Sequence, residues 1–213
     1  MDSNKKHLEE LATIRSLMEK SSRFLSLSGL SGVFAGTFAI FGALNVWLYT
    51  RVGMVKYDEF YNGIGEFSEM PILRFLVLNA LIVLVLALLS GWYFSKRKAD
   101  KMGIPLWNSA SRRMLINLFI PILTGGIFCI VLLFRMELNL IVPLMLVFYG
   151  LGLINAGKYT EYTINLLGIT QIITGILALY FNNQSLLFWT LGFGVWHIVY
   201  GIVMYYQHKK AWF

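Results

Sequence analysis

The stretch YTINLLGITQIITGILALYFNNQSLLFWTLGFGVWHIVYGIVMYY, residues 162–206, decides the fold of this chain. It holds two apolar runs, 162–181 and 184–206, which are separated only by Asn182 and Asn183. Each run is close to the roughly 20 residues that a helix needs to cross about 30 Å of hydrocarbon. Two such runs in close succession predict a pair of antiparallel transmembrane helices.

Four further apolar runs precede this pair. They cover residues 27–50, 71–95, 114–134 and 138–156. The composition of the 213-residue chain agrees with membrane insertion, because 57% hydrophobic and 14% charged residues leave too little polar surface for a water-soluble domain. The sequence therefore predicts an all-α, polytopic membrane protein, with a six-transmembrane-helix bundle over residues 27–206.

Lysine and arginine are distributed unevenly between the two sides of the predicted bundle. Of the 18 in the chain, 14 lie in segments 1–26, 96–113, 157–161 and 207–213, and four lie on the opposite side. Insertion retains Lys and Arg on the cytoplasmic side, so this distribution predicts a cell inner membrane protein with both termini cytoplasmic. The net charge of +7 then indicates contact with anionic lipid, and we expect no nucleic-acid partner.

Three segments outside the runs have distinct predicted roles. Residues 3–25 repeat apolar side chains at near-helical spacing, which predicts that segment 1–26 forms an amphipathic helix at the cytoplasmic interface. The alternative is that residues 3–25 dock a cytoplasmic protein partner. Loop 51–70 mixes aromatic and acidic side chains. This mixture is typical of an interfacial aromatic belt, and the alternative is a lid for a cationic ligand. Residues 207–213 form the predicted cytoplasmic tail.

Four of the six runs contain one octapeptide pattern: Gly, aliphatic, any two, Ile or Val, any two, Gly. Its copies are GLSGVFAG at 29–36, GLGLINAG at 150–157, GITQIITG at 168–175 and GVWHIVYG at 194–201. Seven residues at 100° each return within about 20° of the same helix face, so both glycines of a copy line one side. Close backbone approach favours helix association in lipid, which predicts tight packing within the chain, or alternatively a homo-oligomer interface. The predicted packing glycines are Gly29, Gly32, Gly36, Gly150, Gly157, Gly168, Gly175, Gly194 and Gly201.

His197 is the one ionisable side chain predicted near the middle of a run, and Gln171 occupies the equivalent position in the repeat. Both lie about nine residues, or roughly 13 Å, from the cytoplasmic ends of their runs. We expect the two side chains to face each other in the bundle interior. With Asn155 and Asn79 they are the candidate binding residues, acting either as interhelical hydrogen bonds or as the lining of a narrow polar path. No second histidine accompanies His197 in the runs, so we expect no metal or cofactor.

The sequence lacks the common motifs of covalent chemistry, such as HExxH or a phosphate-binding glycine loop. Residues 29–32, Gly-Leu-Ser-Gly, resemble the GxSG motif of rhomboid proteases. The motif lies on the first run, however, and we expect Ser31 to be several turns from His197, beyond hydrogen-bond reach. The sequence therefore predicts no catalytic residues, with an intramembrane enzyme as a remote alternative.

Longer stretches of the chain carry a family resemblance. They are RSLMEKSSRFLSLSGLSGVFAG at 15–36, FIPILTGGIFC at 119–129, VFYGLGLINAGKYT at 147–160 and LLFWTLGFGVWHIVYGIVMYY at 186–206. On these the chain resembles a family of uncharacterised six-helix bacterial inner-membrane proteins, which implies membrane location and no assigned activity. LGITQIITGILALY at 167–180 is also similar to acid-resistance membrane proteins with GI repeats.

Taken together, these features favour a non-enzymatic regulatory or stress-related membrane factor that acts through packing and partners. The alternative is a small channel or transporter for a neutral solute, which would use Asn, Gln and His side chains.

Overall fold

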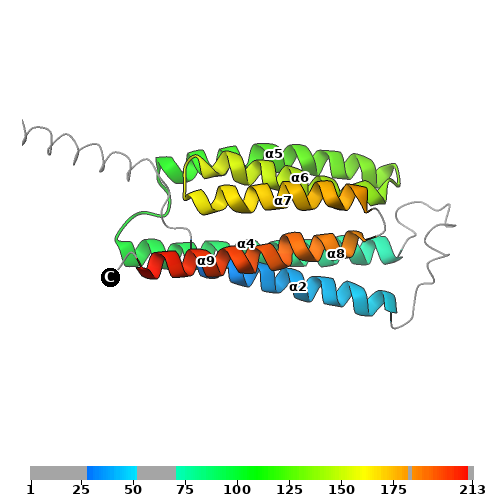
Figure 1. Cartoon of the computed structure of the whole chain (residues 1–213), viewed down its shortest axis with the longest axis horizontal. Coiled ribbons are helices and arrows are strands. Elements are labelled where there is room, and N and C mark those ends of the chain that lie inside the picture. The colour runs from blue at the N-terminus through cyan, green and yellow to red at the C-terminus, as the bar shows by residue number, and fades with distance from the viewer. Residues whose placement is uncertain (1–27, 52–70, 182–183, 211–213) are drawn as a thin grey trace, which may run out of the picture.

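The computed structural model describes residues 28–51, 71–181 and 184–210, and the regular structure in this part of the chain is helical (Figure 1). The helices are α2 (Gly29–Arg51), α4 (Pro71–Met102), α5 (Ser109–Phe134), α6 (Leu138–Gly157), α7 (Tyr162–Tyr180), α8 (Ser185–Trp189), η2 (Thr190–Trp196) and α9 (His197–Lys210). The predicted amphipathic helix at 3–25, nearly all of loop 51–70 and the end of the tail lie outside the described residues.

Six helices in the described part of the chain are long and apolar enough to cross a membrane, which confirms the predicted all-α six-helix bundle. The sixth is composite, because α8, the π-helix η2 and α9 follow one another without interruption. The chain is therefore a polytopic membrane protein.

The second and third spans extend beyond their apolar runs at one end. α4 continues to Met102, and α5 already begins at Ser109. Between them, Gly103 has a φ of +64° and ends α4, and the side chain of Asn108 caps α5 by accepting from the backbone N–H of Ser111. These added turns carry charged side chains, most of which are exposed. Turn chemistry, and not the loss of hydrophobicity, therefore sets the helix ends here.

The helices form two three-helix units. The terminal unit contains α2 between α4 and the composite α8–η2–α9 span, and the central unit contains α6 between α5 and α7. Figure 1 shows α5, α6 and α7 together on one side and α2, α4, α8 and α9 together on the other. The units meet where α8, η2 and α9 contact α7 and α6, and we call this contact the seam.

The helices α4 and α5 lie at the edges of the two units. Only 6% of the most apolar window of each is buried inside the protein, against 39% for the windows of α2 and α6. Their large apolar side chains are exposed along most of the span, as expected for helices that face lipid.

Glycines lie where α2 crosses the sixth span in the terminal unit. A Cβ atom placed on Gly201 would lie 2.5 Å from the carbonyl oxygen of Gly29, and one on Gly36 would lie 2.5 Å from that of Gly194. Between these two points, a Cβ on Gly32 would lie 3.1 Å from a backbone oxygen of α9. The octapeptides of these two helices therefore pack against each other in antiparallel register.

The central unit has a matching crossing of α6 and α7. A Cβ on Gly150 would lie 2.6 Å from the carbonyl oxygen of Gly168, and one on Gly175 would lie 2.9 Å from a backbone oxygen of α6. Gly157 lies directly against the side-chain amide of Asn165. Every predicted packing glycine thus lies at a close contact within the chain, and its contribution to stability stays a prediction.

Candidate functional site

The seam between the two units contains a buried polar network. Gln171 in α7 is fully buried, and His197, the first residue of α9, is 7% exposed. The carbonyl oxygen of Gly192 accepts a hydrogen bond from Gln171 Nε2 at 2.7 Å and from His197 Nδ1 at 3.1 Å. The two predicted residues therefore converge in the bundle interior, but they meet at a backbone carbonyl and not through a bond to each other.

The carbonyl partner determines where the proton of His197 lies. A carbonyl oxygen can only accept, so Nδ1 carries the hydrogen and Nε2 of the neutral ring is an acceptor. Tyr149 Oη, from α6, lies 2.8 Å from Nε2 and donates to it. The rings of Tyr149 and Phe193 lie beside the imidazole, with centroids 5.5 and 6.2 Å away. Both nitrogens of His197 are thus engaged in hydrogen bonds.

The π-helix η2 presents the carbonyl at the centre of this network. A π-helical turn is wider than an α-helical turn and often occurs at functional sites. A Cβ on Gly192 would collide with Leu146 of α6 and would lie 2.8 Å from Gln171 Oε1. Only a residue without a side chain therefore lets the Gln171 amide reach this carbonyl.

A third hydrogen bond crosses the seam, one turn further along α7. Trp196 Nε1 donates to Thr174 Oγ1 at 3.1 Å, and the same hydroxyl donates to the carbonyl oxygen of Thr170 at 2.6 Å. Gln171 Oε1, by contrast, is buried without a hydrogen-bond partner among the described residues. The seam therefore contains one unused acceptor beside an otherwise satisfied network.

The other two predicted binding residues lie elsewhere. Asn79 of α4 donates to the carbonyl oxygen of Gly42 at 3.1 Å and accepts from Asn45 at 2.9 Å, so it joins α4 to α2. Asn155, near the end of α6, accepts from Lys158 Nζ at 3.5 Å. The four candidates therefore do not form a single cluster, and their role in binding stays a prediction.

The expected separation of several helical turns between Ser31 and His197 is wrong. A Cβ on Gly32 would lie 3.1 Å from the carbonyl oxygen of His197, so the two helices place these residues at one level. The reason is that α9 extends further past the crossing with α2 than the apolar runs suggested. Ser31 Oγ nevertheless donates to the carbonyl oxygen of Ser28 at 2.5 Å, and both imidazole nitrogens bond elsewhere. The structure contains no Ser–His pair at this position.

Comparison with known proteins leaves the seam as the main source of functional inference. No family model, curated protein or solved structure matches the chain. The resemblances to uncharacterised inner-membrane proteins and to acid-resistance proteins therefore stay predictions. Within the described residues, no three His, Cys, Asp or Glu side chains lie close enough together to hold a metal ion.

Three members of the network were not predicted from the sequence: Tyr149, Gly192 and Trp196. Tyr149 comes directly before the first glycine of an octapeptide copy, and Trp196 lies inside another. A tyrosine hydroxyl or an indole N–H inside an apolar run could have indicated the network, because such a group needs a hydrogen-bond partner when it is buried. Gly192 has no side chain to reveal its role, although it lies two residues before Gly194 in the stretch Leu-Gly-Phe-Gly.

Replacing Tyr149 by phenylalanine should lower the free energy of unfolding by about 1 kcal/mol. The ring contacts remain, but Nε2 of His197 loses its donor in a buried place. Equilibrium unfolding in detergent micelles measures the change. Tyr180→Phe is the matched control, because Tyr180 is 82% exposed and its loss of a hydroxyl should leave stability unchanged. Equal effects of the two substitutions would contradict the assigned hydrogen bond.

Proposed function

We propose that this chain is a non-enzymatic regulatory or stress-related protein of the bacterial inner membrane, which acts through the packing of its two units and through partners. The observation that supports this proposal is the use of polar groups in the seam. His197, Tyr149, Trp196 and the Gln171 amide nitrogen all bond across the seam between the units. These groups hold helices together, and they are not presented to a substrate.

The network also argues against covalent chemistry. A general base needs a free lone pair within reach of the proton that it removes. The free lone pair of the neutral His197 ring lies on Nε2, and the hydroxyl of Tyr149 occupies it. Ser31, which lies at the level of His197, donates its hydroxyl hydrogen to the carbonyl oxygen of Ser28.

The charge distribution supports the proposed orientation in the membrane. The α4–α5 connection carries Lys96, Arg97, Lys98 and Lys101 on one side and Arg112 and Arg113 on the other. Figure 1 places this connection at the same end of the bundle as the end of α9. Because insertion retains Lys and Arg on the cytoplasmic side, we propose that this end of the bundle is cytoplasmic, and both termini with it.

A second candidate function is the passage of a small neutral solute along the seam. Gln171 Oε1 favours it, because a buried carbonyl oxygen without a partner can accept a hydrogen bond from a hydroxyl or amide group of a solute. The remaining polar groups of the seam bond to one another, and for this reason we rank passage second.

Flux and survival measurements together separate the two functions. We expect liposomes that contain the purified full chain to take up glycerol and urea at the rate of protein-free liposomes, with no effect of Gln171→Leu.

In the host that encodes the chain, we expect deletion to lower survival after acid or osmotic shock, and both wild type and Gln171→Leu to restore it. A protein-dependent flux that Gln171→Leu abolishes would instead establish the second candidate. Unchanged survival on deletion would contradict a stress-related role.

A further inference from the structure

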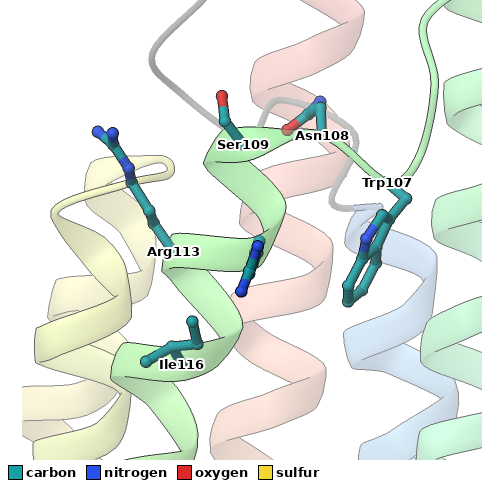
Figure 2. A pocket seen from close by; sticks show the side chains of 6 residues that line it. Trp107, Asn108, Ser109, Arg113 and Ile116 are labelled. Atoms are coloured by element: carbon teal, nitrogen blue, oxygen red, sulfur yellow. The ribbon is translucent and has the colours of Figure 1, made fainter.

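An open cavity of about 590 Å³ lies at the start of α5, outside the seam. It is lined by Trp107, Asn108, Ser109, Arg112, Arg113 and Ile116. Figure 2 shows Trp107 on the connection from α4, across from the first turns of α5, and Arg113 extending back toward the N-terminal end of that helix. The lining has two cations and no acidic side chain, so the cavity favours an anion.

The position of the arginines is unfavourable for the helix itself. The N-terminus of a helix carries a partial positive charge, which is stabilised by acidic side chains and opposed by basic ones. The first turn of α5 has no acidic residue, and Arg112 ends that turn. Arg112 and Arg113 are exposed. An anion bound here would offset both the arginine charges and the helix dipole.

An apolar stripe continues from the cavity along α5. Below Arg112 and on the same face lie Ile116, Ile120, Leu123 and Ile127, whose side chains are 49%, 60%, 62% and 64% exposed. From the first to the last of these residues the helix rises about 16 Å. That length is close to half of the roughly 30 Å hydrocarbon core, which is the depth of one lipid leaflet.

We propose that this cavity and the stripe below it bind an anionic phospholipid of the cytoplasmic leaflet. The guanidinium groups of Arg112 and Arg113 bind the phosphate, because their planar donors fit phosphate oxygens. The indole of Trp107, 69% exposed, lies at the level of the headgroup, where tryptophan is favoured. One acyl chain lies along the stripe that begins at Ile116. The retention of Lys and Arg on the cytoplasmic side explains why these residues are basic. It does not explain why they line a cavity that continues into an apolar stripe.

Binding is measured on the full chain in detergent by native mass spectrometry, with dioctanoyl phosphatidylglycerol as the probe. Dioctanoyl phosphatidylcholine and inorganic phosphate are the comparison ligands. We expect phosphatidylglycerol to bind more tightly than phosphatidylcholine, and inorganic phosphate at equal concentration not to displace it. The double variant Arg112→Gln/Arg113→Gln should bind phosphatidylglycerol about twenty-five-fold more weakly, at about fivefold for each arginine.

The matched control is Lys96→Gln/Arg97→Gln, which removes the same charge from exposed positions of α4 outside the cavity. It should change binding by less than about twofold. Ile120→Asn should weaken phosphatidylglycerol binding without a change in charge, because it interrupts the stripe. If the double glutamine variant does not fold, Arg112→Lys/Arg113→Lys takes its place. This variant should keep only part of the wild-type affinity for phosphatidylglycerol.

Three results would overturn the proposal. Equal weakening by both double glutamine variants would indicate diffuse attraction to the basic end of the protein. Equal affinity for phosphatidylcholine would remove the role of charge. Displacement by inorganic phosphate would indicate a site for a free anion and not for a lipid.

Discussion

Replacing Gly201 by alanine should lower the free energy of unfolding by about 3 kcal/mol. The added Cβ would lie 2.5 Å from the carbonyl oxygen of Gly29 and 2.6 Å from the backbone nitrogen of Val33. Both obstacles are backbone atoms, so no side-chain rotation can relieve the contact, and α2 must move away from α9. The separation would also remove close packing at the other glycines of this crossing. Equilibrium unfolding of the purified protein in mixed micelles measures the loss.

Gly126→Ala is the matched control for this substitution. Gly126 also lies within a membrane-spanning helix, but a Cβ there would have no heavy atom within 4 Å. Alanine should therefore leave stability unchanged or raise it by up to about 1 kcal/mol through its higher helix propensity. If both alanines destabilise the protein equally, the α2–α9 crossing is not as close as described.

Replacing His197 by alanine should lower the free energy of unfolding by about 3 kcal/mol. The substitution removes hydrogen bonds to Tyr149 and Gly192 and leaves a cavity in the seam. The Gly192 carbonyl keeps its hydrogen bond from the amide of Gln171. Most of the loss therefore comes from the cavity and from the hydroxyl of Tyr149, which no longer has the imidazole as its acceptor. Thermal and denaturant unfolding in micelles both report the change.

Two further variants separate the contributions. His197→Phe fills most of the ring volume without hydrogen-bonding groups, and its cost should be smaller than that of alanine. A double-mutant cycle between His197→Ala and Tyr149→Phe should give a coupling energy of about 1 kcal/mol, because each variant already removes the same bond. Strict additivity of the two substitutions would show that the hydroxyl and the imidazole do not interact.

The six spans could be predicted because the bilayer imposes their length and composition. The pairing of the glycine octapeptides could not. Four copies of one pattern are interchangeable by sequence, and nothing in 29–36 distinguishes 194–201 from 150–157 as its partner. The pairing depends on which helices the connections allow to be neighbours and on the shape of the flanking side chains.

The seam was only partly predictable for a different reason. His197 and Gln171 stood out because polar side chains are costly in hydrocarbon. They meet at the backbone carbonyl of Gly192, and the residue types in a sequence do not indicate which backbone carbonyl a side chain will contact. The π-helical turn that presents it also changes the register of the sixth span, which a search for 3.6-residue periodicity does not detect. Ser31 was misplaced because apolar runs do not reveal how far one helix extends past another.

The terminal unit combines the first two spans with the last one, and this arrangement has a consequence for biosynthesis. The crossing of Gly36 with Gly194 cannot form until the ribosome has added nearly 160 further residues, which takes roughly 8–30 s at 5–20 residues per second. The central unit consists of three consecutive spans and can assemble earlier. During that interval α2 presents its glycine face to lipid or to the insertion machinery, so a nascent chain halted before residue 194 should expose a helix-binding surface that the finished protein buries.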